Sequence, residues 1–392
     1  MTLRHPLQLA GSALVMGGLL AQRAALAETP ATNRPLLVYI GTYSGPRSKG
    51  IYLSRLDQAT GKLSVPELAA EARNPTFLAV HPNLRTLYAV GEMSDFGGKK
   101  EGAVSSFSLD AKTGKLALLK QQPSGGGGPC HLSVVGAGRF VLVANYGTGS
   151  IAALPVQMDG QLGPPAAVIQ HTGSSVNPQR QAGPHAHFVT ADPANQYALA
   201  CDLGLDQVLV YRLALRSVEP LVRNEVPPVA IKPGSGPRHL AFHPSGRFVY
   251  LINEMGSTLT ALTYNTEQGS LKEFQTVSTL PEKFKGDNTC AEVQVHPSGK
   301  FVYGSNRGHV SIAAFAVNPD SGRLTYIENQ PTQGKTPRHF AIDPSGQWLL
   351  AENQASDNIV VFRIDAKTGK LTPTGQVVEV GGPVCAVFVK GE

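Results

Sequence analysis

The chain has 392 residues, of which 42% are hydrophobic and only 16% are charged, and its formal net charge is +6. This balance excludes a chain that is disordered throughout, and the 42 glycines and 29 prolines are spread along the sequence instead of forming a collagen period. The longest basic run is Lys99–Lys100, so the basic stripe typical of nucleic-acid binding is missing and we expect no nucleic-acid partner.

The N-terminus carries the pattern of a secretion signal. Arg4 precedes an apolar stretch at residues 7–21, and Ala25-Leu26-Ala27 fits the small-x-small pattern at which signal peptides are cleaved. The stretch is short for a membrane anchor, and no later segment approaches the ~18 consecutive apolar residues of a transmembrane helix. We therefore predict a signal peptide at residues 1–27, a short linker at 28–34, and a mature protein that is periplasmic or secreted and not bound to a membrane. Removing the signal takes away two arginines and no acidic residue, which lowers the net charge to +4.

A repeat organises the rest of the chain. Its best-formed copy runs from Gly236 to Glu254 and reads G-P-R-H-L-A-F-H-P-S-G-R-F-V-Y-L-I-N-E. There are seven copies, and consecutive copies are 46 to 57 residues apart. A period of this length indicates propeller blades or helical repeats. The third residues of the copies are Thr76, Cys130, His187, Arg238, Ala291, Arg338 and Val384.

Each copy carries the pattern of four short strands. In the best copy, β-branched and aromatic runs at 248–252, 258–264 and 271–277 follow the first strand and are separated by glycine-containing turns. Four strands per repeat form one blade of a β-propeller, and no stretch of 12 residues has the apolar period of a helix. The sequence therefore predicts an all-β fold, a seven-bladed β-propeller in one domain at residues 35–390.

The two ends of this domain complement each other. The seventh copy, at residues 383–389, has a first strand and then the chain stops, whereas the mature chain opens with residues 36–43, which match the second strand of a blade. We predict that the C-terminal strand joins the N-terminal strands and closes the last blade. Such closure removes the exposed sheet edges that favour aggregation.

The same geometry predicts where a site lies. The first strand of each blade lines the channel and the second runs antiparallel to it, so the start of the first and the end of the second meet at one end of the channel. The second-strand ends align as Thr42, Glu92, Tyr146, Leu203, Glu254, Arg307 and Gln354. Arginines bind carboxylate or phosphate groups bidentately, so the charged residues gathered here indicate a pocket for an anionic ligand. These residues are His187, Arg238, Glu254, Arg307 and Arg338, with His185 close by.

Structural roles are an alternative for several of these side chains. An arginine in a wet propeller channel can simply bridge two blades. The histidines of the R-H-L and R-H-F segments, His239 and His339, fit buried groups that bond a neighbouring strand. The histidines of the H-P turns fit structural turn residues; they are His81, His243 and His296.

Metal and cofactor motifs are weak or missing in the sequence. His185 and His187 could supply half of a metal site, but the pattern offers no third ligand, and we expect neither a metal nor a cofactor. The four cysteines lack the C-x-x-C spacing of a zinc site. Disulfides are permitted in an exported chain, and the sequence leaves open whether these cysteines are bonded or buried and free.

Several segments resemble one family. Gly236–Pro244 followed by Asn253-Glu254, together with Ser305–Gly308, Cys201–Gly204 and Tyr39–Tyr43, are similar to segments of the lactonase family of seven-bladed propellers. That family includes the propeller-type 6-phosphogluconolactonase and, more distantly, the carboxy-cis,cis-muconate lactonizing enzyme. The resemblance spans the mature chain and implies a metal-free lactone hydrolase or cycloisomerase. By motif position it implies functional roles for His187, Arg238, Glu254 and Arg307.

These observations give a hypothesis for function. We expect a monomeric enzyme of carbohydrate metabolism that hydrolyses a small, anionic or polyhydroxylated lactone, with His187 or Glu254 as the general base. Arg238, Arg307, Arg338 and His185 are the expected substrate-binding residues. The alternatives are a muconate-type cycloisomerase and a non-catalytic periplasmic propeller that binds a protein or a glycan. An aromatic content of 7% with a single Trp348 favours a small ligand over such a platform.

Overall fold

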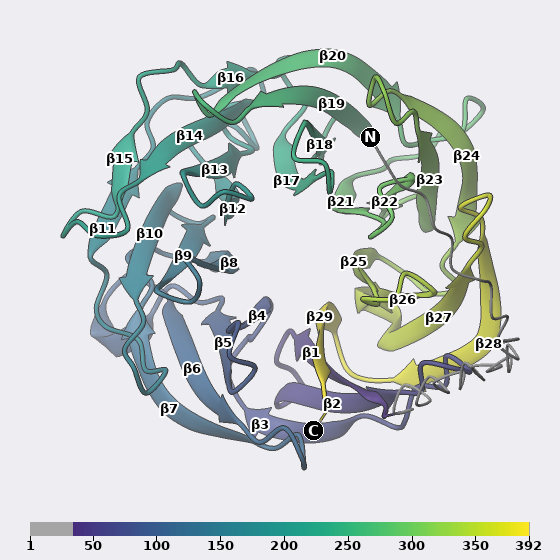
Figure 1. Cartoon of the computed structure of the whole chain (residues 1–392), viewed down its shortest axis with the longest axis horizontal. Helices are drawn as coiled ribbons and strands as arrows, with labels where there is room; N and C mark the ends of the chain where they lie inside the picture. The colour runs from purple at the N-terminus through teal and green to yellow at the C-terminus, as the bar shows by residue number, and fades with distance from the viewer. Residues whose placement is uncertain (1–33, 392) are drawn as a thin grey trace, which may run out of the picture. The chain divides into compact units, whose positions relative to one another are not determined.

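The computed structural model describes residues 34–391, so the predicted signal peptide and all of the linker except Arg34 lie outside the described residues. The described strands form seven antiparallel sheets around a central channel (Figure 1). Each sheet has four strands, and one of them gains a short fifth strand. The prediction of an all-β, seven-bladed propeller is therefore confirmed.

The blades use their strands in the same order from the channel outward. The innermost strands are β29 (Pro383–Lys390), β4 (Leu78–Val80), β8 (Pro129–Val135), β12 (Ala186–Ala191), β17 (Pro237–Phe242), β21 (Cys290–Val295) and β25 (Pro337–Ile342). The second strands are β1 (Leu36–Thr42), β5 (Thr86–Gly91), β9 (Phe140–Asn145), β13 (Tyr197–Asp202), β18 (Phe248–Asn253), β22 (Phe301–Asn306) and β26 (Trp348–Asn353).

In the outer half of each blade, the third strand is still mostly buried and the outermost strand is the more exposed one. The third strands are β2 (Gly50–Leu56), β6 (Ala103–Leu109), β10 (Ser150–Pro155), β14 (Gln207–Leu213), β19 (Thr258–Asn265), β23 (Ser311–Val317) and β27 (Asn358–Ile364). The outermost strands are β3 (Glu67–Glu71), β7 (Leu116–Pro123), β11 (Ala167–Gln170), β15 (Leu221–Arg223), β20 (Ser270–Ser278), β24 (Leu324–Pro331) and β28 (Leu371–Glu379), and the extra strand β16 (Val229–Ala230) pairs with β14. Two 3₁₀ helices, η1 (Phe96–Gly98) and η2 (Gln354–Ser356), complete the described chain, in which no helix is long and apolar enough to cross a bilayer.

The ring closes in the way that the two ends of the sequence predicted. β29 pairs with β1 along its length, from Leu36 opposite Lys390 to Thr42 opposite Pro383. The C-terminal strand thus becomes the innermost strand of the N-terminal blade (Figure 1). The N-terminal blade is also linked to the blade of β25–β28, because the indole Nε1 of Trp348 donates a hydrogen bond to the carbonyl of Gln58 at 3.0 Å.

The core lies between blades, which explains the apolar composition of the second strands. Alternate side chains of a strand point to opposite faces, and in a propeller both faces are covered. In β18, Leu251 packs with Leu199 of the preceding blade, whereas Ile252 packs with Val302 of the next blade. Tyr250 adds a hydrogen bond to the carbonyl of Gly322 at 2.8 Å.

The turn histidines and the cysteines have structural environments. His243 and His296 each donate from Nε2 to a glycine carbonyl of the next blade, at 3.0 and 2.8 Å, and His81 does the same at 3.1 Å. These bonds agree with the structural role predicted for the H-P turns. All four cysteines lie within the described chain and are buried and free, which settles the choice that the sequence left open.

Candidate active site

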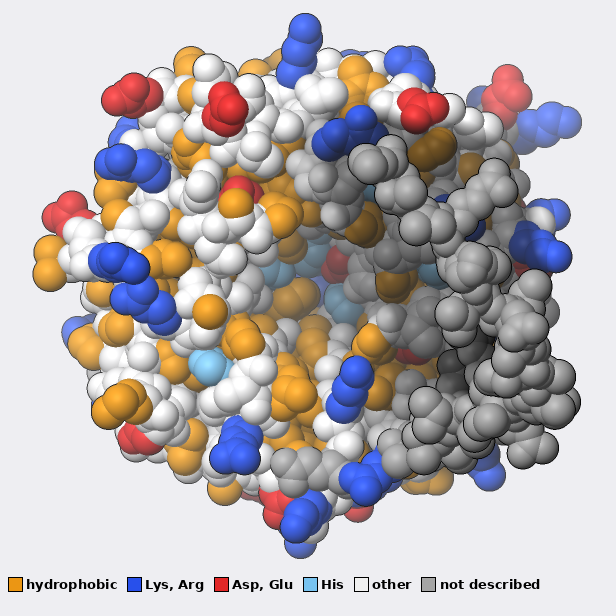
Figure 2. All heavy atoms as spheres, in the orientation of Figure 1, with side chains coloured by type: hydrophobic (Ala, Val, Ile, Leu, Met, Phe, Trp, Pro, Cys, Tyr) orange, Lys and Arg blue, Asp and Glu red, His pale blue; other side chains and the backbone are white. Residues whose placement is uncertain are grey.

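A polar cavity of about 290 Å³ lies where the innermost strands begin and the second strands end. In the view of Figure 2, the centre of the molecule is hollowed, and histidine and acidic side chains are visible in the hollow. The polar cavity is lined by Glu92, Cys130, Tyr146, Arg180, His187, Glu254, Thr289, Arg307 and Arg338. The structure therefore brings together four of the predicted site residues, His187, Glu254, Arg307 and Arg338.

A β-bulge positions the side chains that come from the innermost strands. In β17 the register shifts between Pro237 and His239, so Arg238 has no partner on β18. The same shift surrounds His187 in β12 and Arg338 in β25. A bulge inserts one unpaired residue and re-aims its side chain. The repeat thus places a bulged residue at the same end of the channel in several blades, and the blades differ in which residue they put there.

One member of the predicted second-strand set is wrong by one position. Thr42 pairs with Pro383, so the residue that follows β1, Tyr43, is the counterpart of Glu254. The hydroxyl of Thr42 is buried and lies 2.6 Å from that of Ser48, away from the polar cavity. The error arises because the innermost strand of this blade, β29, comes from the other end of the chain, so no first-strand motif precedes β1 from which its end could be counted.

Glu254 is the centre of an ion-pair network. Its Oε1 accepts a hydrogen bond from Arg180 at 2.8 Å and lies 3.1 Å from an Arg307 nitrogen, while Oε2 accepts from Nε of Arg238 at 3.1 Å. Burial alone would raise the pKa of Glu254, but Arg307, Arg238 and Arg180 outweigh it and lower the pKa to about 2. Glu254 is therefore a carboxylate at neutral pH that holds the guanidinium groups, and it is a poor proton acceptor.

Arg238 supports the polar cavity instead of lining it. Its side chain is 3% exposed, and besides pairing with Glu254 it donates from Nη1 to the carbonyl of Ala291 at 2.7 Å. Burial and the charge of Arg338 lower the pKa of Arg238 to about 10. It contacts a smaller adjoining space in the channel, together with His239 and Glu292. The structure therefore places Arg238 behind Glu254, where its charge acts on the site through that carboxylate.

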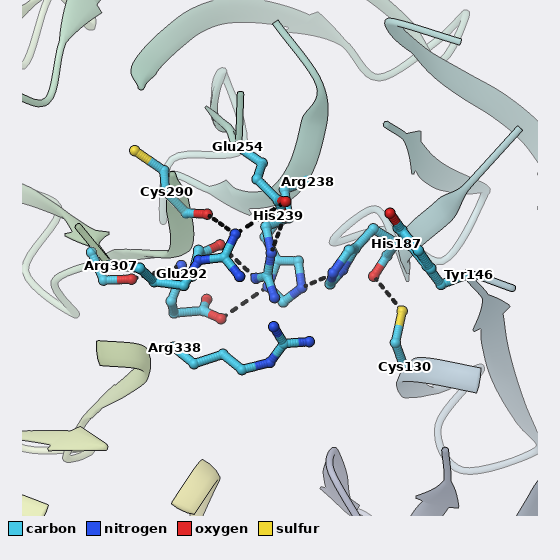
Figure 3. A network of polar contacts seen from close by, with 12 residues as sticks. Cys130, Tyr146, His187, Arg238, His239, Glu254, Cys290, Glu292, Arg307 and Arg338 are labelled. Atoms are coloured by element: carbon cyan, nitrogen blue, oxygen red, sulfur yellow. Dashed lines mark hydrogen bonds and ion pairs between the residues drawn. The ribbon is translucent and has the colours of Figure 1, made fainter. Parts of the chain in front are cut away.

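Arg338 reaches the centre of the site from the side opposite Glu254 (Figure 3). Its Nη2 donates to the hydroxyl of Tyr43 at 3.2 Å, and the guanidinium lies 5.5 Å from the centre of the Tyr43 ring. Burial raises the pKa of Tyr43, so the phenol stays protonated and donates in turn to Glu92 at 2.8 Å. This chain of partners orients Arg338 while leaving part of its guanidinium free to meet a ligand.

His187 is the buried histidine of the polar cavity. Its ring is 4% exposed, its Nδ1 lies 3.2 Å from Nε2 of His239, and the ring of Tyr146 meets it edge to face. Burial and the charges of Arg238 and Arg338 lower the pKa of His187 well below its usual range, so the imidazole is neutral at neutral pH. It can therefore accept a proton without first losing one.

His185, the other predicted binding histidine, does not reach the polar cavity. Its Nδ1 bonds the carbonyl of Tyr146 at 2.9 Å, and its ring stacks on the Tyr146 ring at 4.5 Å. The structure thus places His185 behind Tyr146 as a support. His185 and His187 do not converge as ligands, and among residues 34–391 no group of three or more His, Cys, Asp or Glu side chains is arranged to hold a metal ion.

Arg180 is a cavity residue that the repeat could not reveal. It lies in the loop at residues 171–185, between β11 and β12, and its side chain is 39% exposed. Two buried carboxylates anchor this loop: Asp206 accepts from Gln181 at 2.8 Å, and Asp202 lies 2.7 Å from Nδ1 of His171. The loop joins the outermost strand of one blade to the innermost strand of the next, and it is longer than the equivalent loop at residues 279–289. The available signal was the spacing of 57 residues between the second and third copies, the longest in the chain.

Comparisons with known proteins agree with this architecture. The family described as "Lactonase, 7-bladed beta-propeller" matches residues 37–388. A 6-phosphogluconolactonase of Bacillus subtilis is 39% identical over 305 residues, which cover 78% of this chain and 84% of that protein. The structure of a putative 6-phosphogluconolactonase from Bacteroides fragilis is 37% identical, covers 92% of this chain and 99% of its own, and has a TM-score of 0.85. The periplasmic gluconolactonase of Pseudomonas aeruginosa, also 37% identical, covers 91% of this chain and 100% of its own with a TM-score of 0.87.

Proposed function

The chain belongs to the family of seven-bladed propeller lactonases, as its sequence segments indicated, and from this membership we propose that it hydrolyses a monosaccharide lactone that carries an anionic group. One observation carries the proposal: three arginines and a neutral histidine face a cavity of about 290 Å³. Small-molecule sites usually have volumes of ~300–1,000 Å³, so this cavity suits one sugar ring better than an oligosaccharide.

The charge around the polar cavity supports an anionic substrate. Arg180, Arg307 and Arg338 line it and Arg238 lies behind it, whereas Glu92 and Glu254 are its two carboxylates. The site therefore keeps a net positive charge that a carboxylate or phosphate group would neutralise. The names of two relatives indicate candidate substrates: 6-phosphogluconolactone from the Bacillus protein and gluconolactone from the Pseudomonas protein.

The proposed reaction is attack of water on the lactone carbonyl. As the water oxygen bonds to the carbonyl carbon, His187 accepts a water proton at Nε2 and the carbonyl oxygen becomes an oxyanion. Arg307 and Arg338 approach the polar cavity from different blades, where they stabilise this oxyanion. Collapse of the tetrahedral intermediate breaks the bond to the ring oxygen, which takes the proton from His187 and leaves an open hydroxy acid.

Substrate binding tunes the proposed base. The charges of the neighbouring arginines help to lower the pKa of His187 in the empty site. An anionic substituent on those arginines, followed by the developing oxyanion, offsets their charge and raises the pKa of His187 as the proton is transferred. Glu254, whose pKa is about 2, remains ionised throughout and keeps the arginines in place. Of the two bases that the sequence left open, His187 fits the role.

We place the reaction in the periplasm and assign it to a monomer. The sequence pattern of residues 1–27 is that of a secretion signal, and one relative is a periplasmic gluconolactonase. The closed ring supports a monomer because, in the described residues, every blade finds both of its neighbours within the chain.

The test is lactone hydrolysis by the mature protein at neutral pH, with 6-phosphogluconolactone and with glucono-δ-lactone, in the presence of EDTA. We expect turnover above the spontaneous rate, and a loss of ~10²–10³-fold in kcat in Arg338→Ala, because an oxyanion donor is removed. Arg323→Ala, which changes an exposed arginine in the turn before β24, is the matched control and is expected to keep full activity. Spontaneous rates with both lactones in a folded protein would contradict the proposed function.

A further inference from the structure

A line of buried, hydrogen-bonded side chains extends from His187 across the channel (Figure 3). Nδ1 of His187 lies 3.2 Å from Nε2 of His239, and Nδ1 of His239 lies 2.9 Å from Oε2 of Glu292. His239 is 2% exposed and Glu292 is 6% exposed, and neither lines the polar cavity. We propose that His239 and Glu292 are positioning residues that hold His187 as the neutral tautomer protonated at Nδ1, with the Nε2 lone pair directed to the substrate; this inference rests on the proposed function.

The tautomer follows from the end of the line. An ionised Glu292 can only accept hydrogen bonds, so Nδ1 of His239 must be the donor between them. A neutral His239 then carries its lone pair on Nε2 and accepts from Nδ1 of His187. A neutral His187 whose Nδ1 carries the proton keeps its lone pair on Nε2. The charge at one end of the line thus selects the nitrogen that is free at the other end.

Both histidines are held neutral by their surroundings. Burial and the charge of Arg238 lower the pKa of His239 well below its usual range, as they do for His187. Within residues 34–391, no group bonds Nε2 of His187, although the ring lines the polar cavity. The proton-accepting nitrogen is therefore the one that faces the substrate. When His187 takes a proton, Glu292 stabilises the imidazolium through His239, as an orienting carboxylate does in other acyl-transfer sites.

The charge of Glu292 is itself set by the groups that face it. Arg238 and His239 face it from β17, His339 from β25 with its Nε2 at 3.6 Å, and Glu352 from β26 through a 2.8 Å bond to His339. Burial raises the pKa of Glu292 to about 6. The line therefore loses the negative charge at its end as the pH falls through about 6, and a protonated Glu292 no longer requires Nδ1 of His239 to be the donor. We expect kcat to fall with it.

The first test reads the tautomer directly by NMR of ¹⁵N-histidine-labelled mature protein, with the His187 signals assigned from their loss in His187→Gln. We expect a protonated Nδ1 and an unprotonated Nε2 in the wild type. His239→Phe removes the acceptor and is expected to give a mixture of tautomers. His296→Gln is the matched control, because His296 is a buried, hydrogen-bonded histidine that follows the strand carrying Glu292 but faces another blade; its variant is expected to leave the His187 signals unchanged.

The second test is kinetic and measures whether the variants change kcat without changing KM. His239→Phe is expected to lower kcat by ~10–100-fold with little change in KM, as is usual when an orienting partner is lost. His239→Gln keeps an oxygen that can accept from Nδ1 and is expected to recover part of this loss. Glu292→Gln is expected to lower kcat and to remove the fall in kcat below about pH 6.

Two results would overturn the inference. One is a wild-type His187 protonated at Nε2; the other is wild-type kcat in His239→Phe together with wild-type kcat and pH dependence in Glu292→Gln. Failure of the proposed function looks different, because neither lactone would then be hydrolysed while the NMR signals would still decide the tautomer.

Discussion

The two ends of the innermost strands differ in how much the blades share. At the end away from the polar cavity, the residue after the strand caps its own turn: His243 and His296 accept at Nδ1 from the backbone two residues on, both at 3.1 Å, and Asp343 accepts likewise at 3.0 Å. At the cavity end, the aligned residues include a histidine, two arginines, a cysteine and apolar residues. Residues that recur in the blades therefore serve the fold, whereas residues that differ between blades at the cavity end form the site.

The difference has a physical basis. A turn must satisfy the same backbone groups in every blade, so similar side chains recur. The bulged positions at the other end have no partner on the second strand, and the fold makes no common demand on their side chains. Charge can accumulate there, provided that the charged groups neutralise one another. Glu254 meets this condition by pairing with three arginines.

The largest difference between the two ends is expected when one histidine at each end is replaced by glutamine in separate variants. His187→Gln is expected to lower kcat by ~10²–10⁴-fold because the general base is lost, while the melting temperature changes little. His243→Gln, at the capped end, is expected to leave kcat unchanged. Steady-state kinetics with the preferred lactone and a thermal scan of each variant provide the measurement. Equal losses of kcat in the two variants would contradict the division between site and scaffold.

Removing a carboxylate from an ion pair should destabilise the protein more in the cavity than on the surface. Glu254→Gln leaves three arginines without their counter-charge, and breaking a buried pair of this kind costs ~3–5 kcal/mol in the free energy of unfolding. Glu67→Gln is the control, because its 2.7 Å pair with Arg55 is exposed and such pairs contribute under ~1 kcal/mol. Denaturant unfolding at neutral pH compares the two losses.

The pH dependence of this effect has a definite sign. The pKa of Glu254 is lowered from an ordinary value of 4.5 to about 2 in the folded protein. Its stabilisation is therefore complete above about pH 4.5 and is lost as the pH falls from there toward about 2. The difference in unfolding free energy between wild type and Glu254→Gln should shrink over this range. A difference that grows on acidification would contradict the ionised state assigned to Glu254.

Much of the architecture was accessible from the sequence because its signals are local and repeated. Seven copies of one strand-and-turn pattern predicted the blades, and the incomplete seventh copy predicted the closure. The same alignment also selected His187, Glu254, Arg307 and Arg338, which the structure gathers around one cavity. Alignment succeeded here because a bulge and a strand end occupy equivalent places in successive blades.

The features that the sequence could not predict depend on contacts without a repeat. Arg180 comes from a long loop between two blades, and only the fold shows that this loop turns toward Glu254. His185 was expected in the site, but a hydrogen bond to the carbonyl of Tyr146 turns its ring away from the cavity. His239 was interpreted as a core histidine; it is buried as expected, yet its partner is His187. Spacing carries no information on such partners.

A substitution at the capped end should cost stability without affecting catalysis. Asp343 is fully buried and accepts hydrogen bonds from the backbone of Trp348 at 2.8 Å and of Ser345 at 3.0 Å. Asp343→Ala leaves these donors without their charged acceptor, which is expected to lower the free energy of unfolding by ~1–3 kcal/mol. Denaturant unfolding measures the loss, and kcat under native conditions is expected to stay unchanged. A fall in kcat comparable to that of His187→Gln would show that the two ends are coupled.

The smallest effect is expected at Arg180, where the division between scaffold and site is least sharp. Its guanidinium pairs with Glu254 but is 39% exposed, and Glu254 keeps two other arginines when Arg180 is removed. Arg180→Ala should therefore leave kcat and stability nearly unchanged and raise KM about tenfold, which corresponds to the ~1.4 kcal/mol of one charge-assisted contact. Arg223→Ala, an exposed arginine of the same blade, is the control. If Arg180 meets the anionic substituent itself, the rise in KM is confined to 6-phosphogluconolactone; an equal rise for glucono-δ-lactone would mean that Arg180 acts only through Glu254, and the loop would then belong to the scaffold.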